Sequence, residues 1–519
     1  MHLSRRRVLQ SSAMALFAST SPMKTAFGQP GLKHEPFAFE SASKALSALR
    51  SRDVSAHELT RLCLDRIAAT SDSINAVASL REEQALAEAK RIDDARAAGD
   101  ALGPLAGLPV TLKESFNVKG LPTVWGNPDF PSTPAQEHSA VAERLSAAGA
   151  IILGKTNASL MLANWDSENP VYGRTSNPWN LDRVPGGSSG GAAAALSSGL
   201  SFLEVGSDLG GSIRQPAANC GVYGHKPTAG IVPQRGHMPT GAPPAMQVAV
   251  PEIASVSELP VAGPMARSAA DLHLALNILG GPDGPAKSAL SYKTPPPRQT
   301  HLKAFRVGYV MSHPDAEPDA TSRNVLNALI QSLDGQVAEL IEGWPEGVDP
   351  LRQRDLRHYF RATIGTMMAS PDQAHEIIQE SEQDGPGWAV GDYYGAYNQG
   401  FADRRVDFIA KEIERLQLRR AWQHYFSKFD VFLMPVQTRT ARGHGELTDE
   451  DAFASHLWFA AATVTGLPAT TAPAGIGTDG LPVGVQILGP HYEDATSIAF
   501  AEALARAEIA GFQPPPAFL

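Results

Sequence analysis

Two glycine-rich turns, each carrying a serine, hold the side chains of this sequence that are best suited to chemistry. The first turn, Gly186–Gly191, contains Ser188, and the second, Gly206–Ala217, contains Ser212. Glycine adopts backbone conformations that other residues avoid, and it lets a bound molecule approach the main chain closely. The amide groups just before Ser212, those of Leu209-Gly210-Gly211, could point inward as an oxyanion hole. By themselves, the turns fit catalysis and a purely structural or anion-binding role about equally well.

The residues of these turns, and of several segments beyond them, follow the pattern of a known family. The stretch from Gly186 to Ala217 resembles the signature block of the amidase signature family, with nearly every characteristic position present. Further segments resemble landmarks of that family, in the family's order: Leu108–Phe116, Gly154–Asn157, Asn177–Asn180, Gly224–Thr228 and Gly480–Gln486. The resemblance covers about residues 40–510. It implies a large α/β/α sandwich and an enzyme that hydrolyses a carbon–nitrogen amide bond.

The resemblance implies a triad of Ser212 as nucleophile, Ser188 as bridging serine on a cis peptide bond, and Lys113 as general base. A serine hydroxyl is a weak nucleophile at pH 7 and needs a base within hydrogen-bond reach. A lysine can serve only when neutral, which requires burial to lower its pKa from about 10.4 towards 7. Ser188 would then accept the proton of Ser212 and pass its own to Lys113. The expected product is an acyl-enzyme on Ser212.

Residues around the triad receive supporting roles. We expect Ser189 to donate a hydrogen bond to the lysine, and Asp208 and Arg214 to pair with each other or to bind the backbone of the turn. Two positions depart from the family pattern. Glu114 stands where Asp is commoner, and Glu204 stands where a small residue is preferred. If Glu204 points inward, it needs a partner.

A second hydrolase interpretation comes from Gly187–Gly191, which fits the G-x-S-x-G nucleophile elbow with Ser189 as nucleophile. That fold, which would make the protein an esterase, needs an acid and then a histidine downstream. His491 could be the histidine, with Asp430 or Asp449 as the acid, but nothing in their surroundings singles them out. This interpretation remains the enzymatic alternative.

Cofactor and metal sites are not expected. Gly149–Thr156 fits the phosphate-loop expression, but its variable positions are Ala-Ile-Ile-Leu, which favour a buried strand over a phosphate-binding nest. Two isolated cysteines, Cys63 and Cys220, argue against a thiolate metal site. We expect them to be small buried hydrophobic residues, although a disulfide between them stays open. The proposed chemistry requires no cofactor.

Strand-like and helix-like segments alternate along the chain, which predicts an α/β fold around a mixed, mainly parallel sheet. The expected strands are Leu108–Leu112, Ala150–Leu153, Ser201–Gly206, Phe305–Val310, Val431–Met434 and Val483–Leu488. The expected helices include one that begins with a capping box at Ser55 and Glu58, then His138–Ala148, Ala192–Ser198 and Thr496–Ala507. The last third of the chain is expected to complete the same sheet.

The N-terminus has the pattern of a targeting segment. Ser4–Gln10 resembles a twin-arginine export motif, and the apolar run Ala13–Ala18 follows it. We therefore expect residues 1–28 to be an export signal and the mature protein to be periplasmic or secreted, with no membrane attachment after signal removal. Residues 29–519 would form one amidase domain, with core motifs in 105–230, a variable substrate-pocket region in about 233–430 and the completion of the sheet in 430–510.

The chain of 519 residues has a formal net charge of −10, which argues against a nucleic-acid partner. The function expected is hydrolysis of a small-molecule amide, whose pocket walls would come from Met161–Asp166 and from residues 350–400. Two other functions stay open: a non-catalytic periplasmic binding protein on the same scaffold, and the glutaminase-like subunit of a tRNA-dependent amidotransferase. The substrate and the oligomeric state are left open, with a homodimer as one option.

Overall fold

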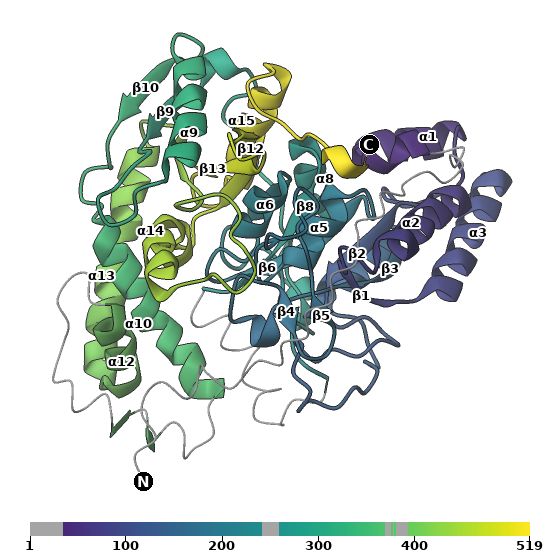
Figure 1. Cartoon of the computed structure of the whole chain (residues 1–519), viewed down its shortest axis with the longest axis horizontal. Coiled ribbons are helices and arrows are strands. Elements are labelled where there is room, and N and C mark those ends of the chain that lie inside the picture. Colours follow the sequence, from purple (N-terminus) through teal and green to yellow (C-terminus); the bar gives the residue numbers. More distant parts are fainter. Residues whose placement is uncertain (1–34, 241–258, 369–374, 377, 380–392, 519) are drawn as a thin grey trace, which may run out of the picture.

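A central sheet runs through the computed structural model, which describes residues 35–240, 259–368, 375–376, 378–379 and 393–518. Within these residues the sheet has eleven strands in the order β1-β3-β2-β6-β8-β7-β12-β13-β11-β9-β10 (Figure 1). They are β1 (Val77–Leu80), β2 (Pro109–Lys113), β3 (Ile151–Thr156), β6 (Leu203–Asp208), β7 (Tyr223–Lys226), β8 (Val261–Ala266), β9 (Arg306–Tyr309), β10 (Glu339–Glu342), β11 (Val431–Pro435), β12 (Ala469–Ile476) and β13 (Pro482–Leu488). A separate small hairpin joins β4 (Glu168–Asn169) and β5 (Gly173–Arg174).

Helices flank this sheet. They are α1 (Ala42–Ser51), α2 (Ala56–Thr70), α3 (Glu82–Ala98), α4 (Ala140–Ala147), α5 (Gly190–Ser197), α6 (Arg214–Cys220), α8 (Ala269–Leu279), α9 (Ala320–Leu333), α10 (Pro350–Met368), α12 (Tyr393–Ala402), α13 (Arg405–Phe426), α14 (Asp449–Thr465) and α15 (Asp494–Arg506). Short 3-10 helices add Glu35–Phe39, Leu160–Leu162, Gly284–Ser288, Leu302–Ala304 and Pro516–Phe518. None of the described helices is long and apolar enough to cross a bilayer.

The direction of the strands differs in part from the sequence-based prediction. The α/β class and the mixed sheet are confirmed, and β11, β12 and β13 complete the same sheet as β2 and β6, as expected. The expected majority of parallel pairs is wrong. Of the ten neighbouring pairs in the described sheet, four are parallel and six antiparallel. Five of the six antiparallel pairs involve β7, β8, β12 or β13, which lie between the two parallel parts of the sheet, and the sixth joins β1 to β3 at the edge.

Local sequence signals place the main elements correctly. Ser55 and Glu58 form the expected capping box at the start of α2, which satisfies amide groups that have no partner within the helix. The run that includes Ile151 and Ile152 is the buried strand β3, so the phosphate-loop match is indeed a strand. Lys113 is the last residue of β2 and is buried with the rest of that strand.

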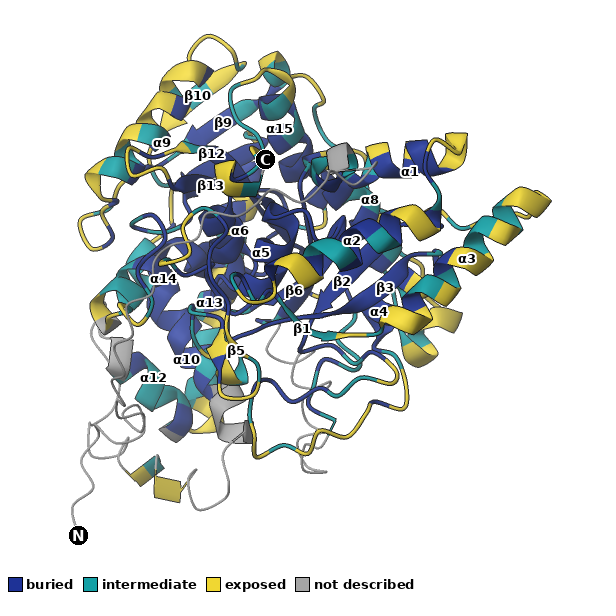
Figure 2. Cartoon of the chain, turned by 45° about the vertical axis from the view of Figure 1, so that its right-hand side comes forward, coloured by how far each residue is buried: buried dark blue, intermediate teal, exposed yellow. Residues whose placement is uncertain are grey.

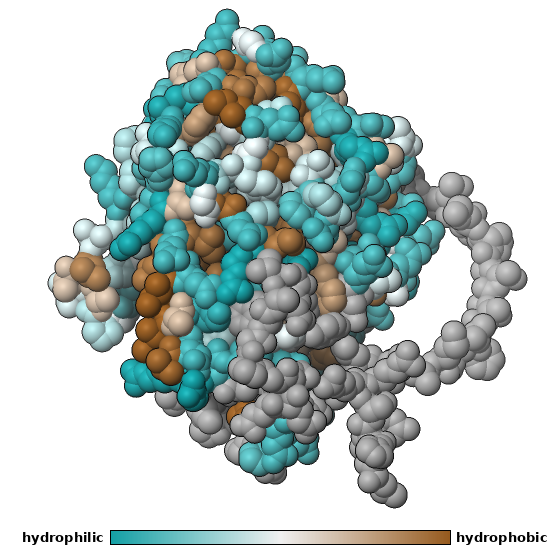
Figure 3. All heavy atoms as spheres, turned by 90° about the vertical axis from the view of Figure 1, so that its left-hand side faces the viewer, coloured by the Kyte–Doolittle hydropathy of each residue, from teal (hydrophilic) through white to brown (hydrophobic). Residues whose placement is uncertain are grey.

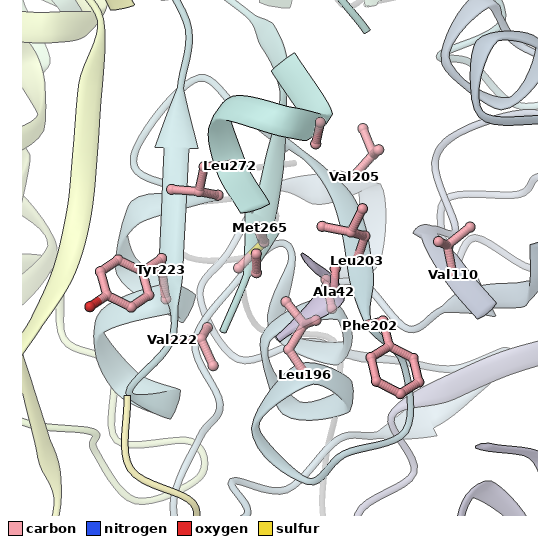
Figure 4. Close-up of a cluster of buried hydrophobic side chains, with 14 of the residues drawn as sticks. Ala42, Val110, Leu196, Phe202, Leu203, Val205, Val222, Tyr223, Met265 and Leu272 are labelled. Carbon is pink, nitrogen blue, oxygen red and sulfur yellow. The ribbon is translucent and has the colours of Figure 1, made fainter. Parts of the chain in front are cut away.

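The core lies on the sheet and beneath its helices. Figure 2 shows the central strands as buried, while the outer faces of α3 and α9 are exposed. Figure 4 shows one cluster in which Leu203 and Val205 of β6 lie close to Met265 of β8 and Leu196 of α5. Every residue of α5 is buried, and its run of alanines lets it pack closely on β2 and β6. This packing fixes the backbone on either side of the two glycine-rich turns.

One helix keeps an apolar stripe at the surface. Val406, Ile409, Ile413 and Leu416 of α13 are exposed, at a spacing that places them along one face of the helix. Figure 3 shows the side of the molecule on which this helix lies, with hydrophobic patches among hydrophilic atoms. No described contact shows what would cover this face.

Candidate active site

A cavity of about 400 Å³ lies beside the carboxyl end of β6, a volume typical of sites for small molecules. The end of β6 and the segment that follows it line this cavity with Ser207, Leu209, Gly210 and Ser212. The turn before α5 adds Ser188. The structure therefore brings both glycine-rich turns to one site, as the sequence predicts.

Lys113 reaches this site from the end of β2. Its Nζ atom donates hydrogen bonds to Ser188 Oγ at 2.6 Å and to Ser207 Oγ at 3.0 Å. Burial lowers the pKa of Lys113 from 10.5 to about 7, against the opposing effect of Asp208, Glu114 and Glu204. A pKa in this range makes the neutral amine, which is the form that can accept a proton, accessible near pH 7.

Two other buried lysines show why the partners of Lys113 matter more than its burial. Burial also lowers the pKa of Lys155 to about 8 and that of Lys226 to about 7. Lys155 lies 3.7 Å from Glu114 and donates to the Thr123 hydroxyl at 2.8 Å, and neither partner lines the cavity. Lys226 donates to two backbone carbonyl groups at 2.8 and 3.0 Å, which have no proton to transfer. Of the three lysines, Lys113 is therefore the one that contacts hydroxyl groups of the cavity wall.

Ser188 is held in place by its turn. The peptide bond between Gly187 and Ser188 is cis, as the family resemblance implies. The amide of Gly187 donates to Gln215 Oε1 at 3.0 Å, and Gly186 has a φ of 88°, which favours glycine. The turn thus presents the Ser188 hydroxyl to Lys113.

Ser212 lines the same cavity as Ser188. The carbonyl of Ser212 accepts a hydrogen bond from the amide of Ser189 at 3.2 Å, which ties the second turn to the first. Among the described contacts, the hydroxyls of Ser212 and Ser188 form no hydrogen bond to each other. Hydrogen bonds between catalytic groups are often long in unliganded enzymes and tighten when substrate binds. Both serines line the same cavity.

The predicted oxyanion hole is only partly available. The amide of Gly211 donates to Asp208 Oδ1 at 3.0 Å, so it cannot also serve an oxyanion, and this part of the prediction is wrong. Asp208 competes for the amide because its short side chain folds back over the turn. The amides of Leu209 and Gly210 have no acceptor within the described part of the chain and lie on the cavity wall. Position 211 requires glycine because its φ is 92° and because an added Cβ would lie 2.6 Å from the Phe459 ring.

Asp208 and Arg214 form the expected ion pair. Arg214 Nη2 lies 2.8 Å from Asp208 Oδ1, and both side chains are fully buried. Burial alone would raise the pKa of Asp208, but the Arg214 guanidinium holds it below its usual range. Asp208 also accepts from the amides of Gly211 and Ile213, and Arg214 donates to Gln486 on β13 at 2.7 Å. The pair therefore anchors the second turn to the sheet.

The expected hydrogen bond from Ser189 to the lysine is not made. The Ser189 hydroxyl instead donates to the Ser207 carbonyl at 3.3 Å, and the Ser207 hydroxyl takes the place beside Lys113. Sequence reasoning missed Ser207, whose position near the end of β6, just before the second turn, was the available signal. Ser189 supports the site by holding the backbone of Ser207.

Glu114 and Glu204, which depart from the family pattern, are both buried beside β2. Glu114 accepts from the amides of Val124 and Trp125 at 2.7 and 3.0 Å and so anchors a cavity loop. Glu204 points inward, opposite Thr111, and its carboxyl lies beside the hydroxyls of Thr111 and Thr156. Burial raises the pKa of Glu204 to about 8, so this carboxyl is neutral at pH 7 and needs no charge partner.

The alternative nucleophile elbow does not form. Ser189 is fully buried, does not line the cavity, and uses its hydroxyl on the backbone of β6. Asp430 pairs with Arg306 at 2.7 Å rather than with a histidine. An esterase built on Ser189 is therefore contradicted.

Both cysteines are thiols in the protein interior. Cys63 and Cys220 are both free and buried, so the open disulfide is excluded. Burial raises the pKa of Cys63 to about 12, which makes it inert as a nucleophile. No group of three or more potential metal-ligating side chains occurs within the described residues. The export segment in residues 1–28 lies outside them.

The cavity walls come from the regions that the sequence indicated. Met161 to Trp165 line one side, and residues of α10 and α12 line another. The sequence did not single out Arg357 or His237 as lining residues. It also did not predict the contact of Trp165, whose Nε1 donates a hydrogen bond to the Gly210 carbonyl at 3.2 Å. These residues sit in segments without a motif, so only the folded chain reveals that they reach the site.

Comparisons with known proteins agree with this fold and identify the family. A family model described as Amidase matches residues 58–498. The A subunit of the glutamyl-tRNA(Gln) amidotransferase from Synechococcus sp. (strain CC9605) is 33% identical over 464 residues, covering 85% of this chain and 91% of that protein. A crystal structure of an amidase is 28% identical with a TM-score of 0.70, covering 90% of this chain and all (100%) of the other. The peptide amidase of Stenotrophomonas maltophilia is 25% identical with a TM-score of 0.70, covering 93% and 99% of the two chains. The extent of these matches shows that the chain belongs to the amidase signature family of carbon–nitrogen amide hydrolases.

Proposed function

We propose that this protein hydrolyses the amide bond of a small molecule through an acyl-enzyme on Ser212, with Ser188 as proton relay and Lys113 as base. The observation that carries the proposal is the 2.6 Å hydrogen bond from Lys113 Nζ to Ser188 Oγ, made in a buried site where the pKa of the lysine falls to about 7. A buried neutral amine next to a hydroxyl is the arrangement that serine activation requires.

The reaction proceeds in two halves. In the first, Ser212 Oγ attacks the amide carbonyl and its proton passes to Ser188, which gives its own proton to Lys113. The amides of Leu209 and Gly210 donate to the developing oxyanion. When the tetrahedral intermediate collapses, the protons return along the same path and the amine leaves as a neutral molecule. In the second half, water takes the place of the amine and releases the carboxylic acid.

Labelling with a fluorophosphonate tests this proposal and separates a hydrolase from a binding protein on the same scaffold. The probe should form one adduct on Ser212 of the folded protein, located by peptide mass spectrometry. Lys113→Ala should slow labelling by about a hundredfold or more, because the base is lost. A folded wild-type protein that stays unlabelled at Ser212 would favour the binding protein.

A second candidate function is favoured by the relatives, because the proteins similar to this chain include several glutamyl-tRNA(Gln) amidotransferase A subunits. Such a subunit would release ammonia from glutamine for use by a partner. Hydrolysis of glutamine by the isolated chain, compared with a panel of aryl and aliphatic amides, separates the two functions. Glutamine as the preferred substrate, together with co-purifying subunits, would support the amidotransferase role.

We also propose export to the periplasm or beyond, supported by the twin-arginine-like Ser4–Gln10. Fractionation of cells that express the full chain tests it. Replacement of Arg5 and Arg6 by lysine should leave the protein in the cytoplasm, and an unchanged distribution would contradict export.

A further inference from the structure

The segments that follow β2 and β3 form one wall of the active-site cavity. Trp125 comes from the first segment, and Met161 and Leu162 come from the second. The three side chains belong to one apolar cluster together with Phe130 and Met238. This wall offers a bound molecule the surface of an indole ring and a thioether, which are both suited to contact with an aromatic ring.

The three lining residues of this wall all have a left-handed backbone, which bulky side chains avoid. The φ angle is 50° at Trp125, 51° at Met161 and 57° at Leu162. Residues in such conformations persist only where the surrounding structure holds them, and they gather at active sites and ligand clamps. Three of them in one cavity wall are therefore typical of a binding surface.

Hydrogen bonds hold Trp125 in this conformation. Its amide donates to Glu114 Oε2 at 3.0 Å, and its carbonyl accepts from the amide of Met161 at 2.8 Å. Its indole Nε1 donates to the carbonyl of Ser115 at 3.4 Å. Glu114 is itself fixed, because Lys155 Nζ lies 3.7 Å from its other carboxyl oxygen. The indole thus has a defined position before a substrate binds.

Two further rings continue from the indole. The ring centre of His237 lies 5.7 Å from that of Trp125 and 4.6 Å from that of Phe116, with tilted planes in both pairs. Burial, helped by Lys113, lowers the pKa of His237 to about 3, so the imidazole is uncharged at pH 7. Its Nε2 atom lies 2.9 Å from the Ser115 hydroxyl. Neutral rings attract one another in tilted arrangements at such distances, and a ligand ring against the indole would extend the row.

We infer that the substrate is an amide with an aryl group, which packs against Trp125 and Met161 while Ser212 attacks the amide carbonyl. This inference rests on the proposed function and names its substrate class. The indole face and the polarisable sulfur both bind an aromatic ring better than a saturated ring of similar size. Because the wall and Ser212 line the same cavity, one molecule can contact both.

A protection assay with two neutral amides tests this inference. The rate at which a fluorophosphonate labels Ser212 is measured in the presence of phenylacetamide or of its saturated analogue, cyclohexylacetamide. The cyclohexyl compound is the more apolar of the two, so burial of apolar surface alone would favour it. In the wild-type protein phenylacetamide should protect at a concentration about fivefold lower, because the contacts between aromatic rings outweigh that difference.

Three variants of the wall locate this preference. Trp125→Leu keeps an apolar side chain but removes the ring, and it should abolish the preference for the phenyl compound. Trp125→Phe keeps a smaller ring and should retain a preference of about threefold. Met161→Leu removes the sulfur and should lower the preference about twofold.

Trp344→Leu is the matched control, because Trp344 packs on Phe432 at 5.8 Å between ring centres and is not among the described lining residues. It should retain the wild-type preference. Equal protection by the two amides in the wild type, stronger protection by cyclohexylacetamide, or a preference that Trp125→Leu leaves unchanged would overturn the inference while leaving the hydrolase intact. If Ser212 is not labelled at all, the proposed function fails, and calorimetric binding of the two amides to wild type and Trp125→Leu still decides whether the wall binds an aryl group.

Discussion

The two sides of the cavity differ in how their polar groups are held. Around β2, β6 and the start of α5, the groups proposed to react are serine hydroxyls, backbone amides and the buried Lys113 amine, positioned by strands and by the buried pair of Asp208 and Arg214. On the side of α10, α12 and α14, long cationic and aromatic side chains reach in from helices. Under the proposed function, the sheet side carries the chemistry, where small displacements are costly, and the helical side contacts the rest of the substrate.

The largest expected effect lies on the sheet side. Ser212→Ala should lower kcat by about 10⁴-fold or more, because no acyl-enzyme can form, while the substrate still binds. Steady-state kinetics and equilibrium binding measure the two quantities. Ser201→Ala removes a buried hydroxyl that bonds Leu203 O away from the cavity and should change little. A loss of kcat below about tenfold for Ser212→Ala would contradict the assignment of the chemistry to the sheet side of the cavity.

The second-largest expected effect concerns the buried ion pair that anchors the second glycine-rich turn. Arg214→Met should reduce the free energy of unfolding by about 3–5 kcal/mol, since it leaves Asp208 buried without its charge partner. Urea unfolding measures the change. Arg61→Met, which breaks an exposed pair with Glu82, should cost less than about 1 kcal/mol. Similar losses in both variants would show that the turn does not depend on the buried pair.

The pH profile of kcat/KM should report the state of Lys113. The base must be neutral, so activity should rise about tenfold per pH unit below 7 and level off above the lysine pKa of about 7. Glu204→Gln removes a carboxyl whose charge raises that pKa, so the midpoint should move to lower pH. The shift should be small, because a pKa of about 8 keeps Glu204 mostly neutral in this range. A profile without an inflection between pH 6 and 8 would argue against Lys113 as the base.

The smallest predicted effect concerns Trp165, which joins the two sides. Its indole donates to Gly210 O at 3.2 Å and packs on His456 of α14 at 4.9 Å between ring centres. Trp165→Phe should lower kcat/KM about fivefold, the value of one neutral hydrogen bond of about 1 kcal/mol. Trp179→Phe is the control, since its indole makes a similar bond to Cys220 O at 3.1 Å outside the cavity. Equal effects would show that Trp165 acts through stability alone.

Much of this site could be predicted from the amino-acid sequence alone. The glycine turns and the end of a buried strand at Lys113 are local features, because glycine content and apolar runs act on the backbone within a few residues. For the same reason, the capping box of α2 and the strand nature of Ile151–Leu153 are correct from sequence. The family pattern added the pairing of Ser188 with Lys113, which spacing alone could not supply.

The tertiary structure decided what depends on contacts between remote segments. Asp208 takes the Gly211 amide and Ser207 takes the place expected of Ser189, because side-chain direction at a turn follows from the neighbours it packs against. The antiparallel strands arise where distant parts of the chain insert into the sheet, which periodicity cannot show. Arg357 reaches Gly210 from a helix far along the chain. The sequence by itself thus determined the groups proposed to react, and only the fold determined which amides, cations and aromatic rings surround them.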